Sequence, residues 1–402
     1  MDPIVVIGAG QAGASAVTEL REQGYAGPVT LIGAEPHLPY ERPPLSKGYL
    51  LGNDPIESAF VHDRQWYAAH DIDLRTGAFV TDLDLGRKSV SLLDGTEIAY
   101  DQLLLATGSR PRRLPLADDS GVPTAYLRTI EDSDRIRAAF GPGHRIVIIG
   151  AGWIGLEVAA AARAAGTEVT VFEVAELPLL RVLGPRVAQA FADLHRAHGV
   201  DLRLGTAVSA ADLAGATLVV VGVGVAPDAS LAQGAGLAVS NGVLVDATLR
   251  TSHPDVYAVG DIANHDHPLL GRRVRVEHWD TAIEQAKVAA HNLVGGRRQR
   301  LTTGSPTSSP TSTTSAWNTS GMPPLTPTPR SSCRAIWGPS SGGPIGCPAA
   351  WSSPACMSTS GVPSTRSESR SATHSPEGPA RRSAALALSV VERGPGTAFN
   401  RT

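Results

Sequence analysis

The chain has 402 residues, of which 42% are hydrophobic, enough for two or three globular domains that each have their own core. Its formal net charge of −3 excludes the basic surplus typical of a nucleic-acid-binding protein. No apolar run reaches membrane-spanning length, and the first expected strand starts by Ile4, which leaves no room for a signal peptide. We therefore expect a cytoplasmic protein with neither nucleic acid nor membrane as a partner.

Two stretches of the chain have the same expected order of elements, which is an apolar strand, a glycine-rich turn, a helix and a second strand. In the first stretch these elements fall at 4–7, 8–13, up to about residue 23, and 29–32. In the second they fall at 146–149, 150–155, up to about residue 165, and 169–172. This order opens a dinucleotide-binding unit. Two copies of the unit predict two nucleotide sites.

The segments between and after these units add further elements. Apolar positions alternate around Asp94-Gly95, which predicts a hairpin over residues 89–98. Buried strands are expected at 103–105, 218–221 and 256–260, and a helix at 281–293. From about Gly295 the periodicity stops, and Ser, Thr, Pro and Gly dominate. That composition buries too little apolar surface to offset chain entropy, so we expect a disordered, low-complexity tail over 301–402.

Each glycine-rich turn has the Gly-x-Gly-x-x-Gly spacing. The first glycine permits the tight bend, the second lets a pyrophosphate approach the backbone, and the third packs the helix on the strand. An acidic residue, Glu35 or Glu173, follows each turn by about 20 residues, where a carboxylate can accept hydrogen bonds from ribose hydroxyls. Because Glu173 would repel a 2'-phosphate, the second site favours NADH over NADPH. The glycines are Gly8, Gly10, Gly13, Gly150, Gly152 and Gly155.

The three cysteines all lie in the expected tail, at Cys333, Cys347 and Cys356. The rest of the chain therefore has no disulfide or thiol chemistry, and any redox work needs a cofactor. His265 and His267 have metal-like spacing, but no other ligand lies near them in the sequence. We interpret them as part of a solvated loop and expect no metal site.

Seven motifs occur in an order that resembles the FAD-dependent, NADH-linked ferredoxin reductases of oxygenase systems, a family that includes putidaredoxin reductase, rubredoxin reductase and the apoptosis-inducing factor. The resemblance covers about residues 3–296. The motifs are Gly8 to Gly13, Tyr40-Glu-Arg-Pro-Pro-Leu-Ser-Lys47, Ala106-Thr-Gly108, Gly150 to Glu157, Gly222-Val-Gly224, Val259-Gly-Asp261 and Glu277-His-Trp279.

The resemblance implies a set of site residues. It places FAD at Gly8, Gly10, Gly13, Glu35, Arg42, Lys47, Ala106, Thr107, Gly108, Arg128, Asp261 and Trp279. It places NADH at Gly150, Gly152, Gly155, Glu157, Glu173, Arg181, Gly222 and Gly224. Lys47 and Glu157 would be the catalytic pair, with Glu157 at the nicotinamide and Lys47 near the flavin.

Residue chemistry bears on three of these assignments. Lys47 is one of three lysines in an arginine-rich chain, and a compact ammonium near the flavin would stabilise the negative charge that arrives with a hydride. The alternative is a solvated surface lysine. Asp261 follows a strand, where it could bind a ligand, cap a helix, or do both. Trp279 would on general grounds belong to a core, so its assignment depends on the resemblance.

The expected fold is α/β, with two Rossmann-like domains. An FAD-binding domain at 1–114 and 245–300 flanks an inserted NAD(H)-binding domain at 115–244. Disulfide reductases built on such domains carry a cysteine pair on the first helix, which this chain lacks, so electrons must leave through another molecule. The family supplies an iron-sulfur ferredoxin. A basic patch of Arg110, Arg112, Arg113 and Arg145 could receive it, or these arginines could simply be solvated.

The expected function is hydride transfer from NADH to FAD, followed by single-electron delivery to a ferredoxin that serves an oxygenase. One alternative keeps NADH oxidation and sends the electrons to quinone, oxygen or a dye. Another is a truncated, non-catalytic nucleotide-binding product.

The chain departs from the family in two places, and the second departure motivates the last alternative. About a hairpin's length is missing between residues 208 and 218, at the edge of the second domain. The family's third domain is also replaced by the Ser/Thr/Pro-rich tail. Read one base early, the codons of residues 305–319 and 354–361 admit strings that resemble that third domain. We therefore predict a frameshift near Leu301, in the gene or in its reported sequence.

Overall fold

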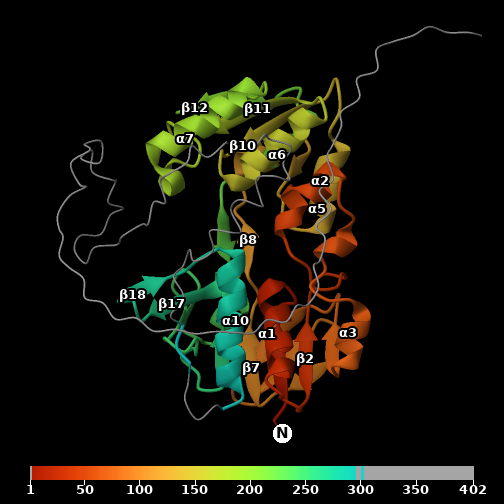
Figure 1. Cartoon of the computed structure of the whole chain (residues 1–402), viewed down its shortest axis with the longest axis vertical. Helices are drawn as coiled ribbons and strands as arrows, with labels where there is room; N and C mark the ends of the chain where they lie inside the picture. Colours follow the sequence, from red (N-terminus) through yellow and green to blue (C-terminus); the bar gives the residue numbers. More distant parts are fainter. Residues whose placement is uncertain (1, 296–299, 303–402) are drawn as a thin grey trace, which may run out of the picture. The chain divides into compact units, whose positions relative to one another are not determined.

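The computed structural model describes residues 2–295 and 300–302 (Figure 1). The expected tail and the frameshifted codons therefore lie outside the described residues, apart from Leu301 and Thr302. Within the described ranges, no helix is long and apolar enough to cross a bilayer. No group of three or more His, Cys, Asp or Glu side chains in those same ranges could hold a metal ion.

The first sheet is parallel throughout, in the order β16-β7-β1-β2-β3. Its central strand is entirely buried, as expected for an apolar run with helices on both faces of a sheet. The helices α1 (Gln11–Glu22) and α10 (Trp279–Leu293) pack against each other beside it (Figure 1). The strands are β1 (Ile4–Ile7), β2 (Val29–Ile32), β3 (Ile72–Arg75), β7 (Gln102–Leu105) and β16 (Val256–Ala258).

The second sheet is also parallel, in the order β12-β11-β10-β13-β9. Helix α6 (Trp153–Ala164) follows its glycine-rich turn, as α1 follows the first turn. Helix α5 (Ile130–Ala138) begins at a capping box of Thr129 and Asp132, and α7 (Leu180–Ala197) is kinked at Gly184. The strands are β9 (Thr124–Ala125), β10 (Arg145–Ile149), β11 (Glu168–Glu173), β12 (Asp201–Leu204) and β13 (Leu218–Val221).

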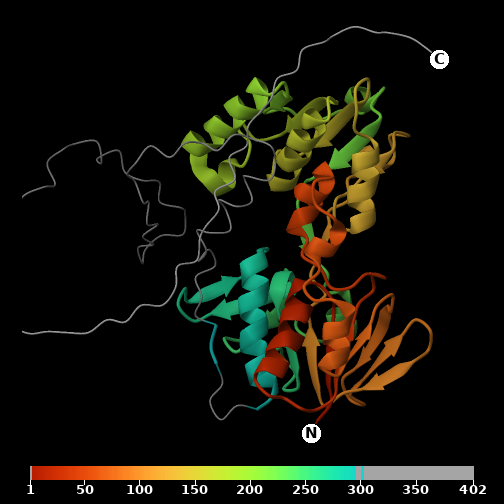
Figure 2. The ribbon, with the colours of Figure 1, turned by 45° about the vertical axis from the view of Figure 1, so that its right-hand side comes forward.

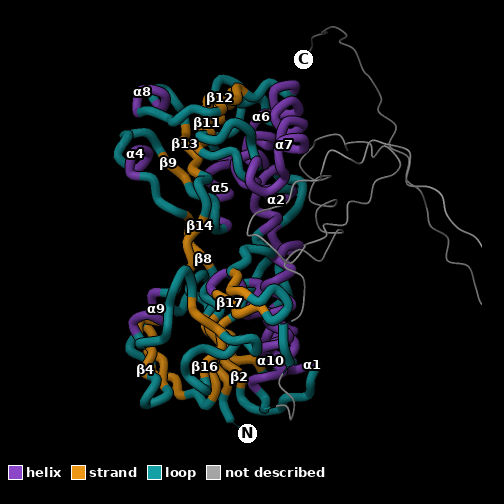
Figure 3. Tube along the Cα trace, turned by 90° about the vertical axis from the view of Figure 1, so that its left-hand side faces the viewer, coloured by secondary structure: helices purple, strands orange, loops and turns teal. Residues whose placement is uncertain are grey.

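The chain passes between the two sheets along a short antiparallel pair, β8 (Ser109–Pro111) and β14 (Val225–Pro227), visible in Figure 3. After β14 the chain returns to the first core at once, because Ala229 and Leu237 pack there. A segment earlier in the sequence packs against the second sheet instead. Leu45 and Leu50, although they precede β8, are buried in the core of the second sheet. The core of the second sheet therefore includes a segment from the first part of the chain.

Two small sheets lie beside the first. The predicted hairpin is confirmed, since β5 (Ser89–Leu92) pairs antiparallel with β6 (Glu97–Ala99), and β4 (Val80–Asp84) pairs with β5. These are the orange strands at the lower right of Figure 2. The other small sheet contains β15 (Val243–Val245), β17 (Ala263–His267) and β18 (Arg272–Val274).

The interpretation of His265 and His267 as a solvated loop is wrong. Both lie on β17 and are buried, with 2% and 4% of their surface exposed. Alternation along the strand points these two side chains inward and Asp266 outward. Burial lowers the pKa of His265 to about 4, so its ring is neutral, and it forms a hydrogen bond with Thr302. A neutral imidazole with a partner can be buried at little cost.

The remaining elements are short, and several of them position the site described below. They are η1 (Pro43–Ser46), α2 (Gly48–Leu51), η2 (Ile56–Ala59), α3 (Arg64–Ala69), α4 (Pro115–Asp118), α8 (Ala210–Leu213), α9 (Ser230–Gly234) and η3 (Gly260–Ile262).

Candidate functional site

The first glycine-rich turn combines two packing glycines with one open position. A Cβ atom on Gly8, whose φ is +112°, would lie 2.2 Å from the carbonyl oxygen of Ala106. A Cβ atom on Gly13 would lie 1.9 Å from the carbonyl oxygen of Gly8. A Cβ atom on Gly10 would meet nothing within 4 Å. Protein packing explains the outer glycines, whereas Gly10 leaves its backbone open to a bound group.

The second turn repeats this arrangement. Cβ atoms on Gly150 and Gly155 would lie 2.4 Å and 2.0 Å from the carbonyl oxygens of Gly222 and Gly150. A Cβ atom on Gly152 would have only the Gly222 oxygen as a neighbour, at 4.0 Å. Gly224 has a φ of +95°, and its carbonyl accepts a hydrogen bond from the backbone of Arg112. Both turns therefore fit a pyrophosphate at the start of a helix.

The acid of the first unit, Glu35, is held by two side chains. Its Oε1 accepts a hydrogen bond from Nη2 of Arg42 at 2.6 Å, and its Oε2 accepts one from the phenol of Tyr40 at 2.5 Å. Arg42 also donates to the Tyr40 oxygen at 3.0 Å and to the carbonyl of Arg128. Sequence reasoning did not assign a role to Tyr40, although it stands in the same motif as Arg42. A buried phenol carries no signal in a single sequence that identifies its partner.

Arg128 connects this group to Asp261. Its Nη2 lies 4.0 Å from Oδ2 of Asp261, which also accepts a hydrogen bond from Ser109 at 2.7 Å. Burial and the neighbouring Arg42 lower the pKa of Arg128 to about 10. Two guanidinium groups that repel each other in a half-buried place fit an anionic ligand. The structure thus brings Glu35, Arg42, Arg128 and Asp261 into one network.

The turn Ala106-Thr107-Gly108 lies next to this network. Ala106 is buried against Gly8, and Thr107 donates to the carbonyl of Asp228 at 2.7 Å. Gly108 has a φ of +70°, and a Cβ atom there would lie 3.1 Å from Nη2 of Arg128. The motif therefore shapes the backbone beside the arginines and adds no ionisable side chain.

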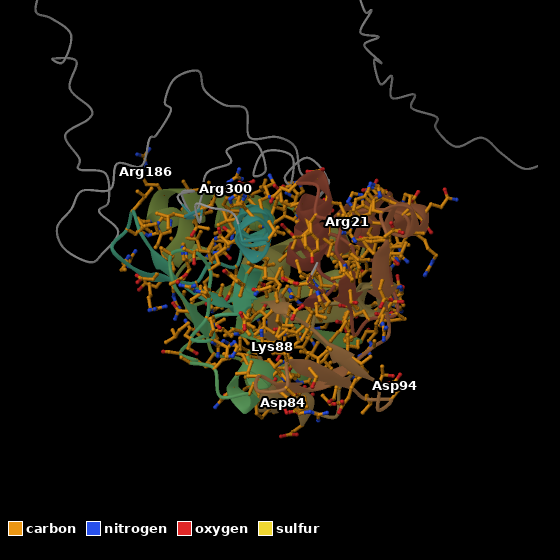
Figure 4. All side chains as sticks on the ribbon, turned by 90° about the horizontal axis from the view of Figure 1, so that it is seen from below. Arg21, Asp84, Lys88, Asp94, Arg186 and Arg300 are labelled. Carbon is orange, nitrogen blue, oxygen red and sulfur yellow. The ribbon has the colours of Figure 1, made fainter. Side chains whose placement is uncertain are left out.

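Lys47 and Glu157 form the predicted pair. Nζ of Lys47 lies 2.9 Å from Oε2 of Glu157, and the two side chains are 14% and 19% exposed. Lys88 pairs with Asp255 at 2.7 Å and Lys287 with Glu284 at 2.7 Å, but these lysines are 39% and 46% exposed (Lys88 is labelled in Figure 4). Lys47 is thus the least exposed of the three lysines, so it is not a solvated surface lysine.

A second donor holds Glu157. The hydroxyl of Ser46 lies 2.5 Å from the same Oε2 that accepts from Lys47. Lys47 and Ser46 stand at the end of η1, whose two prolines set its start, and Glu157 lies on α6 just after Gly155. Sequence reasoning did not find Ser46, because nothing in the local sequence links it to a residue more than a hundred positions away.

Five buried side-chain polar atoms in the described ranges have no hydrogen-bond partner, and two of them lie at neighbouring helix starts. These two are Nε1 of Trp279, at the start of α10, and Oε1 of Gln11, at the start of α1. Gly260 links the two helix starts, because a Cβ atom there would lie 3.3 Å from Cβ of Ala12 and 3.8 Å from Cβ of Ala282. Buried polar groups without partners are rare unless a ligand completes them. This observation fits a polar ring system such as a flavin.

Two predicted residues of the second unit remain, Glu173 and Arg181, and only Glu173 lies beside the glycine-rich turn. Glu173 accepts hydrogen bonds from the backbone of Ala151 at 2.8 Å and of Ala175 at 2.9 Å, which sets its carboxylate beside the glycine-rich turn. Arg181 is exposed in the first turn of α7 and contacts none of the other predicted site residues in the described ranges.

The expected basic patch is smaller than the sequence suggested. Arg110 pairs with Asp228 at 3.1 Å and Arg113 with Asp118 at 2.9 Å, both close to β8. Arg145 starts β10 and donates to the carbonyls of Ala214 and Asp212. It therefore lies at the end of β10 opposite Gly150, apart from the other arginines.

Comparisons with known proteins agree with this geometry. Residues 2–286 match the family described as pyridine nucleotide-disulphide oxidoreductase. The chain is 44% identical over 309 residues to the ferredoxin–NAD(+) reductase component of the anthranilate 1,2-dioxygenase system of Burkholderia cepacia, covering 73% of this chain and 76% of that one. It is 40% identical over 315 residues to putidaredoxin reductase of Pseudomonas putida, covering 73% and 74%.

A solved structure is also similar. The covalent complex of putidaredoxin reductase with putidaredoxin matches with a TM-score of 0.71 and 38% identity, over 74% of this chain and 76% of that one. The resemblance and the α/β fold class predicted from the sequence are confirmed.

Proposed function

The chain belongs to the pyridine nucleotide-disulphide oxidoreductase family, and from this premise we propose that it is an FAD-dependent NADH:ferredoxin reductase. Relatives named as ferredoxin–NAD(+) reductases and a reductase solved with its putidaredoxin support this function and an iron-sulfur ferredoxin as partner. The single observation that carries the proposal is the partly buried ion pair of Lys47 and Glu157, which joins a lysine that follows the first glycine-rich unit in the sequence to the helix after the second glycine-rich turn. NADH as reductant supports the cytoplasmic location.

The proposal assigns FAD to the first unit. Gly10 would let the pyrophosphate reach the backbone, Arg42 and Arg128 would neutralise its charge, and Glu35 would accept hydrogen bonds from the ribose. Asp261 and Trp279 would hold the rest of the cofactor, with Trp279 Nε1 as a free donor. When bound, FAD accepts two electrons from a hydride donor and releases them one at a time.

The second unit would bind NADH. Gly152 leaves room for its pyrophosphate, and Glu173 stands where the ribose hydroxyls and a 2'-phosphate would lie. Glu157 would orient the nicotinamide, and the Lys47 ammonium would stabilise the negative charge that arrives with the hydride at the flavin. Because both side chains are largely buried, water screens this charge poorly, and the effect of the pair on the reaction is strong.

We place the domain boundaries from the cores. The FAD domain would comprise residues up to about 110 and from about 228, and the NADH domain the residues between, because the packing changes at β8 and β14. This moves the second boundary earlier than the 245 expected from the sequence. Residues 40–60 belong to the FAD domain by sequence, yet several of them pack in the other core.

The function is tested with an absorption spectrum of the purified full chain before and after anaerobic NADH. We expect flavin absorption from about one FAD per chain, bleaching by NADH, and weaker bleaching by NADPH. Putidaredoxin is then added as electron acceptor, beside a quinone and a dye. Equal acceptor rates would favour the quinone or dye reductase, and a colourless protein would favour the non-catalytic product.

The frameshift near Leu301 is proposed separately, supported by the family-like strings that the shifted codons admit. Sequencing the coding DNA decides it. A frame shifted by one base that encodes the family's third domain past Leu301 is the expected result, and a continuous frame in which no such domain is encoded contradicts it.

A further inference from the structure

Ser46 occupies an unusual place beside the ion pair. Its side chain is buried, with 6% of the residue exposed, and its hydroxyl lies 2.5 Å from Oε2 of Glu157 and 3.3 Å from the carbonyl oxygen of Pro43. A serine hydroxyl has one proton to donate. The shorter contact to an ionised acceptor takes that proton, since hydrogen bonds to charged groups are the stronger ones. The bond that η1 could make to its own backbone is therefore the minor one.

The result is a carboxylate with one oxygen held by two donors. Oε2 of Glu157 accepts from both Lys47 and Ser46, whereas Oε1 accepts no hydrogen bond in the described part of the chain. That arrangement leaves Oε1 without a protein donor in the described ranges and so available to accept from a ligand. The two donors differ in stiffness, because the lysine ammonium ends a four-carbon stem and the serine hydroxyl turns about one torsion.

The backbone of Ser46 is itself fixed. Ser133, which is fully buried on α5, donates to the carbonyl of the preceding Leu45 at 2.8 Å. The two prolines of η1 limit the segment from the other side. Ser46 is thus a rigid donor on a rigid segment.

We propose that Ser46 is a positioning residue that holds Glu157 in its orientation toward the nicotinamide, independently of Lys47. The proposal rests on the proposed function. The ammonium of Lys47 is then free to adjust toward new negative charge, while the carboxylate stays in place. Loss of the hydroxyl lets Glu157 rotate and slows hydride transfer, with little effect on how tightly NADH binds through its pyrophosphate and ribose.

The chain offers a matched control at Ser58. This serine also lies in a short 3-10 helix, and its hydroxyl donates to the carbonyl of Pro55 at 2.7 Å, the same local bond that Ser46 could make to Pro43. Ser58 has no contact with Glu157. Ser58→Ala therefore reports what losing a local backbone bond does by itself.

The first measurement is the rate at which NADH bleaches the flavin in single-turnover mixing of the full chain. Ser46→Ala is expected to lower the limiting rate about tenfold, with FAD content unchanged and the half-saturating NADH concentration within about twofold. Ser46→Thr keeps the hydroxyl and is expected to recover most of the rate. Ser58→Ala is expected to leave all three quantities unchanged. A wild-type rate in Ser46→Ala overturns the proposal.

The second measurement does not depend on activity. In a double-mutant cycle on denaturant unfolding, Ser46→Ala is expected to shift the unfolding equilibrium about tenfold when Glu157 is present. The shift should be less than about twofold in the Glu157→Met background. Equal shifts in both backgrounds overturn the contact on which the proposal stands. Coupling in the cycle, combined with a wild-type chain that NADH does not bleach, overturns the proposed function and with it the role of Ser46 at the nicotinamide.

Discussion

At the scale of single residues, the glycines divide into two kinds. Gly13 and Gly155 are needed by the protein, because a Cβ atom on either would lie about 2 Å or less from a backbone oxygen. Gly10 and Gly152 have extended backbone and open space in front of them, so alanine would fit the folded chain. Their missing side chains make sense only if a bound group comes close to the backbone.

This division predicts a crossed pair of phenotypes. Gly10→Ala should fold with a Tm within about 2 °C of wild type but lose most of its FAD, and Gly152→Ala should keep FAD while its Kd for NADH rises at least tenfold. Flavin absorbance and NADH titration measure the two effects. Gly13→Ala serves as the packing control and should lower the Tm strongly. A Tm loss in Gly10→Ala as large as in Gly13→Ala would show that Gly10 also serves packing.

Sequence reasoning worked unevenly at this scale. The motifs supplied Lys47 and Glu157, because each occupies a fixed place beside prolines or glycines that a family resemblance can match. Ser46, Tyr40 and Gln11 were missed as site residues, since their roles depend on partners brought together only by folding. Arg145 was grouped with other arginines because the sequence does not show how far the start of β10 lies from β8.

At the scale of elements, long apolar strands and the helices after glycine-rich turns could be predicted. The strands of the small sheet β15-β17-β18 could not. Strand β17 reads Ala-Asn-His-Asp-His and has no apolar alternation, yet it is held by a parallel neighbour on one side and an antiparallel one on the other. Two buried histidines fill its inward positions. Only tertiary contacts make such a segment a strand.

A buried histidine in α7 gives a pH prediction at the same scale. His195 is 2% exposed, and burial, with a smaller effect of His198, lowers its pKa to about 4. The unfolded chain binds the proton near pH 6.5, so stability is present above that pH and is lost as the pH falls toward 4. Between pH 7 and pH 5 the free energy of unfolding should fall by about 2 kcal/mol on account of this residue.

Urea unfolding at the two pH values measures this loss. His195→Leu should remove about 2 kcal/mol of the pH dependence and leave the share that His265 contributes. His198→Gln, at an exposed position at the end of the same helix, should leave the pH dependence nearly unchanged. An undiminished loss in His195→Leu would mean that His195 is protonated in the folded chain.

At the scale of the whole described chain, the core of the second sheet takes in a segment that precedes strand β3 of the first. Leu50 is fully buried among residues of the second sheet, although it stands in the sequence between strands of the first. The sequence suggested a simple insertion of one domain in another. It could not show that Leu50 packs in the second core, because an apolar residue in a loop does not specify the core in which it is buried.

The position of Leu50 in the second core predicts which sheet a cavity at this residue destabilises. Leu50→Ala should lower the free energy of unfolding by about 3 kcal/mol and speed hydrogen exchange in β10 and β13 of the second sheet. Leu20→Ala, at an equally buried position on α1, should speed exchange in the first sheet instead. Peptide-resolved hydrogen exchange distinguishes the two patterns. Faster hydrogen exchange in the first sheet alone in Leu50→Ala would contradict the position of Leu50 in the second core.

The segment that carries Leu45, Ser46, Lys47 and Leu50 also bears on how such a chain can evolve. The antiparallel pair β8 and β14 would by itself allow the inserted half to be exchanged for another, since both junctions lie side by side. Leu45 and Leu50 prevent such a replacement, because a new insert would have to bury them in its own core. Residues 40–60 and the insert should therefore be inherited together. Recombination between relatives should succeed only where both come from the same parent.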